Sequence, residues 1–245
     1  MQIFTAEGLI ALLTLTLLEI VLGIDNVIFI SIISDKLKQE SEKAKARNLG
    51  IMLALAARIG LLFGISWIVS LKEPLITVLE QSFSGRDIIL LLGGLFLMGK
   101  STSEIHAKME MEEEGYNTSK KQPSLMSAII QIVFIDIVFS FDSILTAVGL
   151  VKEISIMITA VIISMAVMFI FAKNISDFIN EHPTFKMLAL SFLIMIGFLL
   201  VAESLGVHVP KAYIYFAMGF AFIVEVLNMR MRKKAKLKAK QEAHR

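Results

Sequence analysis

Long apolar runs separated by short charged stretches organise this sequence. The runs lie at roughly 7–34, 49–71, 86–103, 124–150, 154–173, 185–203 and 212–230. Most are close to the roughly 20 residues that a helix needs to cross a hydrocarbon core about 30 Å thick. Helices are expected because lipid cannot satisfy an open-edged backbone, and runs that are apolar on all sides lack the alternation of a transmembrane barrel. The pattern predicts an all-α membrane protein with about seven transmembrane helices.

The third run is the shortest. Only twelve residues separate Asp87 from Lys100, and these correspond to about 18 Å of helix. This span must therefore recruit its polar flanks, or it must be a tilted or broken element.

Two segments of the chain match each other at fixed spacing. EIVLGIDN at 19–26 is repeated as DIVFSFDS at 136–143, and GLFLMGKS at 94–101 is echoed more faintly by GFLLVAES at 197–204. Spans one to three therefore resemble spans four to six. Because three is an odd number, the second copy must enter the membrane from the opposite side, which is a common transporter architecture.

The predicted organisation is a 3+3 inverted repeat with one additional C-terminal helix. Repeat one covers about 7–103, repeat two about 124–203, and the additional helix about 212–230. Together they form a single transmembrane domain over 1–230, followed by a basic tail at 231–245. The start of the chain lacks the basic segment of a cleaved signal peptide, so the first run is expected to be a retained span.

Positive charge predicts the orientation. Of the 24 lysines and arginines, 19 lie around the ends of spans one, three, five and seven. The positive-inside rule then places the N-terminus outside and the C-terminus in the cytoplasm. The basic tail is either a solvated stop-transfer segment or a segment held near anionic lipid head groups. At the span ends, Lys100, Glu203 and Glu225 are expected to snorkel towards the head groups.

Four carboxylates lie inside the two matched segments. Glu19, Asp25, Asp136 and Asp142 together would cost on the order of 10 kcal/mol to insert unpaired. Each needs a charge partner, a proton or a bound cation, and Arg58 in the second span is a possible charge partner. The alternative is an inert polar network that only holds the helices together.

The angular positions of these residues limit how they can act. On an ideal helix Glu19 and Asn26 share a face, whereas Asp25 points about 120° away from Glu19. The second segment repeats this arrangement. All of them can reach one ion only if the helices bend or unwind near Gly23 and Ser140. Otherwise the two acids of each segment line different parts of a path.

The residue types predict a metal site built from oxygen ligands alone. The candidate ligands are Glu19, Asp25, Asn26, Asp136, Asp142 and Ser143. Carboxylate, amide and hydroxyl oxygens suit Mg²⁺, Ca²⁺ or Mn²⁺. The chain has no cysteine and its four histidines fall in loops and the tail, which disfavours zinc or copper. No organic cofactor is expected.

At these segments the sequence resembles the TerC family, named for tellurium resistance, within the lysine-exporter-like superfamily. The resemblance rests on LEIVLGIDNVIFI at 18–30, IDIVFSFDSILTAVGL at 135–150 and HVPKAYIYFAM at 208–218. It implies a seven-span protein of the bacterial plasma membrane and, as in characterised relatives, manganese export. The family's acidic motifs fall on the six candidate ligands.

The expected function is export of Mn²⁺ from the cytoplasm by rocking one repeat against the other, with carboxylate protonation as a possible driving step. Ca²⁺ or Mg²⁺ could be the substrate instead. Another alternative is a partner protein that assists metalation or folding of secreted proteins, bound through 104–123 or the tail. No enzyme activity is expected, because an intramembrane aspartyl protease uses Gly-x-Gly-Asp and residues 22–25 lack the first glycine. No nucleic-acid partner is expected.

Overall fold

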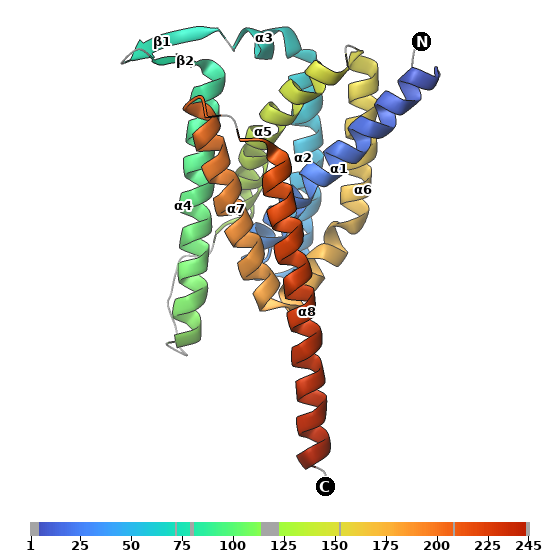
Figure 1. Cartoon of the computed structure of the whole chain (residues 1–245), viewed down its shortest axis with the longest axis vertical. Helices are drawn as coiled ribbons and strands as arrows, with labels where there is room; N and C mark the ends of the chain where they lie inside the picture. The colour runs from blue at the N-terminus through green and yellow to red at the C-terminus, as the bar shows by residue number, and fades with distance from the viewer. Residues whose placement is uncertain are drawn as a thin grey trace.

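The computed structural model describes residues 5–71, 73–78, 81–113, 123–151, 153–207 and 209–243 (Figure 1). Its elements, in chain order, are α1 (Ala6–Ser34), α2 (Glu40–Phe63), α3 (Ile65–Ser70), β1 (Pro74–Val78), β2 (Gln81–Ser84), α4 (Gly85–Glu113), α5 (Leu125–Leu150), α6 (Ile154–Glu181), α7 (Pro183–Ser204) and α8 (Lys211–Ala243). The upper end of the bundle is the end at which α1 begins, and the lower end is the end at which α1 finishes.

Seven of the described helices are long and apolar enough to cross a membrane, which confirms the predicted fold class. The third span is unbroken, because α4 continues from Gly85 to Glu113 and recruits polar residues at both ends. The helix of the second span begins before the predicted apolar run at 49–71. It starts at Glu40, where two acidic residues in the first turn favour a helix N-terminus.

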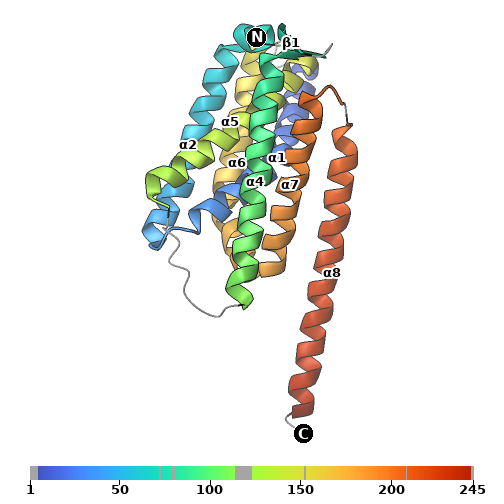
Figure 2. The ribbon, with the colours of Figure 1, turned by 90° about the vertical axis from the view of Figure 1, so that its left-hand side faces the viewer.

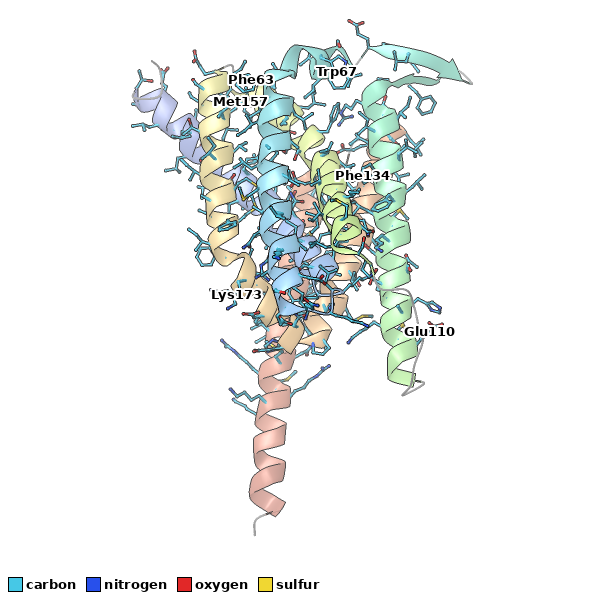
Figure 3. All side chains as sticks on the ribbon, turned by 180° about the vertical axis from the view of Figure 1, so that it is seen from behind. Phe63, Trp67, Glu110, Phe134, Met157 and Lys173 are labelled. Atoms are coloured by element: carbon cyan, nitrogen blue, oxygen red, sulfur yellow. The ribbon has the colours of Figure 1, made fainter. Side chains whose placement is uncertain are left out.

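The connection between the second and third spans contains structure that was not predicted. After α2 the chain forms the short α3 and then an antiparallel hairpin, β1 with β2, which lies at the upper end. Phe63 and Trp67 lie at this same end and are 73% and 60% exposed (Figure 3). Tryptophan is enriched at membrane–water interfaces, so the upper boundary of the membrane is expected near the exposed Trp67.

The transmembrane helices form two bodies, and neither body is one of the repeats. α1 packs along α6 and α2 packs along α5, with further contacts among these four helices; we call them the four-helix body. α4 packs along α7, and α8 contacts α7; we call these the three-helix body. Contacts between the bodies, mainly α4 with α5, α6 with α7 and α1 with α7, are sparser. Each predicted repeat thus supplies two helices to one body and one helix to the other. The inverted repeat itself stays a prediction.

The contact between α4 and α7 depends on glycine. A Cβ atom on Gly94 would lie 2.6 Å from the backbone oxygen of Gly197, and one on Gly197 would lie 2.8 Å from the backbone oxygen of Gly94. These two glycines occupy matching positions in the fainter repeat. Small residues let two transmembrane helices approach backbone to backbone, so the pair sets the spacing of the three-helix body.

Ion pairs link helices at both ends of the bundle. At the upper end, Arg86 of α4 donates to Glu203 of α7 over 3.1 Å. At the lower end, Lys36 after α1 pairs with Glu104 of α4, and Lys100 lies 3.4 Å from the same carboxylate. Lys100 and Glu203, which were expected to snorkel, therefore have charged partners within the protein.

Asp35, directly after α1, also lies at the lower end, where it accepts a hydrogen bond from Ser176 over 3.5 Å. Burial raises the pKa of the Asp35 carboxyl, although Asn180 and the positive charges of Lys186, Lys43 and Arg47 act in the opposite direction. Burial likewise lowers the pKa of the neighbouring Lys36 amine. The lower ends of the helices thus meet in a partly buried, charged junction.

Candidate ion site

Arg58 is the centre of a buried network in the four-helix body. Its side chain is 3% exposed and extends from α2 towards α1 and α5. Nη1 donates to Glu19 Oε2 over 2.8 Å. Nε and Nη2 donate to the two carboxylate oxygens of Asp136 over 3.0 and 2.7 Å. One guanidinium therefore donates to two of the four acids, and its bidentate pairing with Asp136 suits the planar fork of arginine.

Asp136 has little capacity left for a metal ion. Besides the two bonds from Arg58, Asn26 Nδ2 donates to its Oδ1 over 3.2 Å and Ser140 Oγ donates to its Oδ2 over 3.1 Å. An ionised carboxylate offers about four acceptor positions, so four donors fill them. In this arrangement Asp136 can bind a metal only if one of these bonds breaks.

The amide of Asn26 is half satisfied. Its nitrogen donates to Asp136, and its oxygen, in a side chain that is 5% exposed, is buried with no hydrogen-bond donor among the described residues. The assignment of the amide follows from its neighbour, because a carboxylate saturated with donors can only accept. A buried acceptor without a donor is costly, and it is a natural ligand for a cation or a water molecule.

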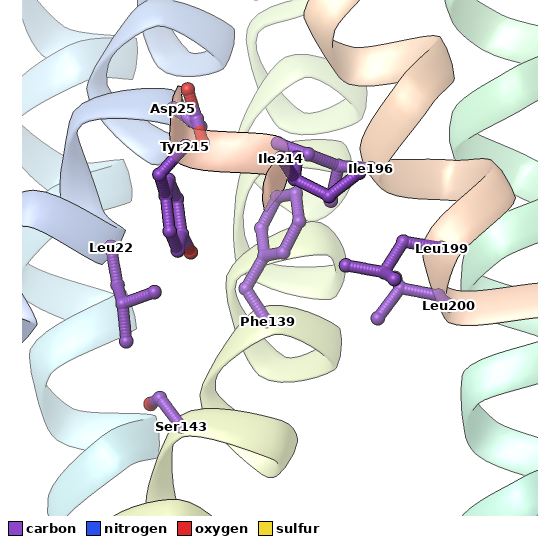
Figure 4. Close-up of a pocket in the computed structure, with 9 residues that line it drawn as sticks. All are labelled: Leu22, Asp25, Phe139, Ser143, Ile196, Leu199, Leu200, Ile214 and Tyr215. Carbon is purple, nitrogen blue, oxygen red and sulfur yellow. The ribbon is translucent and has the colours of Figure 1, made fainter. Parts of the chain in front are cut away.

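Asp25 lies in a different environment. It faces a cavity of about 50 Å³, which is room for a few water molecules. The lining residues are Leu22, Asp25, Phe139, Ser143, Ile196, Leu199, Leu200, Ile214 and Tyr215 (Figure 4). We call this cavity the Asp25 pocket. The Asp25 side chain is 5% exposed, and within the described part of the chain no hydrogen bond or ion pair to its carboxylate is found.

The pocket lies between the two bodies. Asp25 and Ser143 come from α1 and α5 of the four-helix body, whereas Ile214 and Tyr215 come from α8 of the three-helix body. Ser143 Oγ donates to the backbone oxygen of Ser140 over 3.3 Å, which leaves the hydroxyl oxygen able to accept or to coordinate. The pocket thus combines one carboxylate and two hydroxyls with apolar walls.

The predicted ligands are therefore divided between two places. α1 and α5 are continuous helices across Gly23 and Ser140, so the angular separation expected from an ideal helix persists. Glu19, Asn26 and Asp136 gather around Arg58, whereas Asp25 and Ser143 face the pocket. The two acids of the first segment line different places, as the second of the two sequence alternatives describes.

The side chain of Asp142 lies outside the described residues, so its predicted role as a ligand stays a prediction. Over the residues that were searched, no group of three or more His, Cys, Asp or Glu side chains is arranged to hold a metal ion. The assignment of the six residues as one ligand set likewise stays a prediction.

Sequence reasoning missed Ser140, which donates to Asp136, and Tyr215, which lines the pocket. Ser140 lies four residues after Asp136, so helical spacing alone could have indicated the bond. Tyr215 lies within HVPKAYIYFAM, but nothing in the sequence shows which helix it would face.

These features define a class: a polytopic helical membrane protein with an ionised network and a small polar pocket inside its transmembrane region. Comparison with known proteins then gives the family. The model of the "Integral membrane protein TerC family" matches residues 4–240, and the chain belongs to that family.

Curated relatives carry little functional description in their names. An Escherichia coli protein named "UPF0053 inner membrane protein YgdQ" is 52% identical over 92% of this chain and 94% of its own length. A "UPF0053 protein" of Haemophilus influenzae is 50% identical over 93% of this chain and 95% of its own. The longer E. coli "UPF0053 inner membrane protein YoaE" is 50% identical over 91% of this chain but only 43% of its own length. No solved structure matches the chain significantly.

Proposed function

We propose that this protein exports divalent metal cations, Mn²⁺ foremost, from the cytoplasm across the bacterial inner membrane. The observation that carries the proposal is Asp25, a buried intramembrane carboxylate that faces a pocket and has no cationic partner among the described residues. An intramembrane acid with no structural partner is by default a functional one. The names of the E. coli relatives support the location.

The Asp25 pocket offers oxygen ligands to such an ion. Asp25 supplies negative charge and Ser143 supplies a hydroxyl, whereas the unpartnered oxygen of Asn26 lies outside the pocket lining, in the network around Arg58. Asp142 is a further predicted ligand. Hard oxygen donors suit Mn²⁺, Mg²⁺ and Ca²⁺, and the family resemblance favours Mn²⁺ among them.

Arg58 acts in this proposal as a resident cation. It donates hydrogen bonds to Glu19 and to Asp136 whether or not the pocket holds an ion, so neither acid needs a metal as its partner in the buried network. Asp25 lacks such a partner among the described residues, and its charge is therefore the one that faces a transported cation in the pocket. Protonation of Asp25 would remove that charge and release the ion.

The test is Mn²⁺ flux into proteoliposomes that contain the purified protein and a metal-sensitive dye. Asp25→Asn removes the charge and keeps the shape, and we expect Mn²⁺ flux to fall at least about tenfold. Asp177→Asn, at an exposed carboxylate of α6, is the matched control and should transport normally.

Three other outcomes would redirect the proposal. Unchanged Mn²⁺ flux in Asp25→Asn would remove Asp25 from the site. Transport of Ca²⁺ or Mg²⁺ in place of Mn²⁺ would keep the site and change the substrate. If the intact protein moves none of these ions, the partner-protein alternative takes precedence. Cellular manganese under manganese load, with and without the protein, tests the direction of transport.

A further inference from the structure

We propose that Tyr215 is a gating residue: with Ile214 it forms a movable wall of the Asp25 pocket, carried by α8, which opens when the three-helix body shifts against the four-helix body. The proposal deepens the proposed function and rests on it for the identity of the ion. The opening itself is a property of the helices and can be measured without any ion.

The position of the pocket is the first reason. Its polar floor belongs to one body and its outer wall to the other, since Asp25 and Ser143 lie on α1 and α5 while Tyr215 lies on α8. All three side chains line the pocket, and in the view of Figure 4 Tyr215 is drawn between Asp25 and Ser143. Packing is dense along the pairs α1 with α6, α2 with α5 and α4 with α7, whereas the contacts between the bodies are sparse, so relative motion of the bodies disturbs few contacts.

The attachment of α8 is the second reason. Near the lower end, Phe222 of α8 stacks edge-on against Phe185 of α7 with ring centroids 5.3 Å apart. One turn further along, Glu225 accepts hydrogen bonds from Thr184 of α7 and from Asn228. These contacts tie α8 to the start of α7, so α8 travels with the three-helix body.

The surroundings of α8 permit such a movement. α8 lies in front of the bundle in Figure 1 and at its edge in Figure 2, and Phe216 and Phe220 are 76% and 62% exposed. Within a membrane these side chains face lipid, which yields to a moving helix more readily than packed protein does. Tyr215 is only partly exposed and lines the pocket, so adjacent aromatic residues have opposite roles.

The side chain of Tyr215 suits a gate for a cation. Its ring can cover the pocket from the lipid side, and its hydroxyl gives the pocket a polar atom on the α8 wall. Tyr215→Phe keeps the cover and removes only the hydroxyl. Tyr215→Ala removes both, which separates closure of the pocket from contact with the ion.

The ion-free test measures access to the pocket. The chain contains no cysteine, so Ser143→Cys provides one defined target for a small, membrane-permeant thiol reagent. Adding Tyr215→Ala should speed labelling at least about tenfold, whereas Tyr215→Phe and the lipid-facing control Phe216→Ala should not. Equal labelling rates for Ser143→Cys alone and with each added substitution would contradict the proposal that Tyr215 covers the pocket.

The motion is tested by cross-linking. Leu22→Cys with Ile214→Cys, joined by a short bifunctional thiol reagent, would tie the four-helix body to α8 across the pocket. We expect Mn²⁺ flux to fall at least about tenfold and to recover when a reductant cleaves the link. The control pair, Phe185→Cys with Phe222→Cys, links two helices of the same body and should leave flux intact.

The outcomes separate the two proposals. Full flux in the linked Leu22–Ile214 protein would overturn the movable wall and leave the proposed function standing. If the unmodified protein carries no Mn²⁺, the proposed function is wrong. The movable wall would still stand if labelling of the Ser143→Cys variant depends on Tyr215.

Discussion

The two bodies of this protein are held together by different physics. In the four-helix body, Arg58 joins three helices through charged hydrogen bonds to Glu19 and Asp136. In the three-helix body, α4 and α7 meet through the backbones of Gly94 and Gly197, and Arg86 pairs with Glu203 at the upper end. The four-helix body depends on charged hydrogen bonds at its centre. The three-helix body depends on two glycines that let the backbones of α4 and α7 approach closely.

The difference shows which buried acids serve structure and which remain available. Asp136 is saturated with donors inside its body, whereas Asp25 lies on the surface of that body and faces the other one. Both carboxylates are almost fully buried, so burial alone does not distinguish them. The distinction is whether the protein supplies the compensating donors.

The largest expected effect comes from removing the charge at the centre of the four-helix body. Arg58→Ala leaves two buried carboxylates without their cation, and we expect a loss of about 3–5 kcal/mol in stability. Thermal unfolding of the detergent-solubilised protein measures it. Combining Arg58→Ala with Glu19→Gln and Asp136→Asn should recover part of the loss, because no uncompensated charge then remains. A triple variant less stable than Arg58→Ala would contradict charge compensation as the cause.

The comparison of the two carboxylates is sharpened by replacing each with its amide. Asp136→Asn weakens the bidentate bond from Arg58 and should cost about 2–3 kcal/mol of stability. Asp25→Asn removes an uncompensated charge, so it should leave the unfolding temperature unchanged or raise it. If both variants lose equal stability, the division into a structural acid and an available acid is wrong.

The three-helix body is tested at its glycine contact, where the expected effect is smaller. Gly94→Ala places a methyl group against a backbone oxygen that cannot rotate away, and overpacking of this kind costs about 1–3 kcal/mol. Gly99→Ala in the same helix has nothing within 4 Å of the added Cβ and should be neutral or slightly stabilising. Equal unfolding temperatures for the two variants would show that the close approach carries no stability.

Much of the fold follows from the sequence because the membrane imposes it. The apolar runs predicted seven spans, and seven helices of the described part of the chain are suitable. The segment 74–84 was not predicted, since its few residues carry only a weak strand signal beside strong helical ones. The two bodies were not predicted either. The repeat indicates which helices correspond, whereas packing decides which helices touch, and that depends on pairs such as Gly94 and Gly197.

The candidate site was predictable as residues and not as an arrangement. Helical geometry alone separated Glu19 from Asp25 by about 120°, and the continuous α1 keeps them apart. The sequence could not show that Arg58 would pair with Asp136 and leave Asp25 without a partner among the described residues. That choice depends on the depth of one arginine in α2 relative to α5. The part played by Tyr215 depends in the same way on where α8 docks.

The exchange of helices between the two halves has a consequence for biosynthesis. α1, α2 and α4 leave the ribosome first, yet their main packing partners are α6, α5 and α7. The first half of the chain must therefore wait in the membrane with its packing faces uncovered until the second half is inserted. During that interval Glu19 and Arg58, which both belong to the first half, can neutralise each other before Asp136 has been synthesised. The ion pair of Arg58 with Glu19 would thus keep both charges compensated in the nascent chain, as well as stabilise the finished protein.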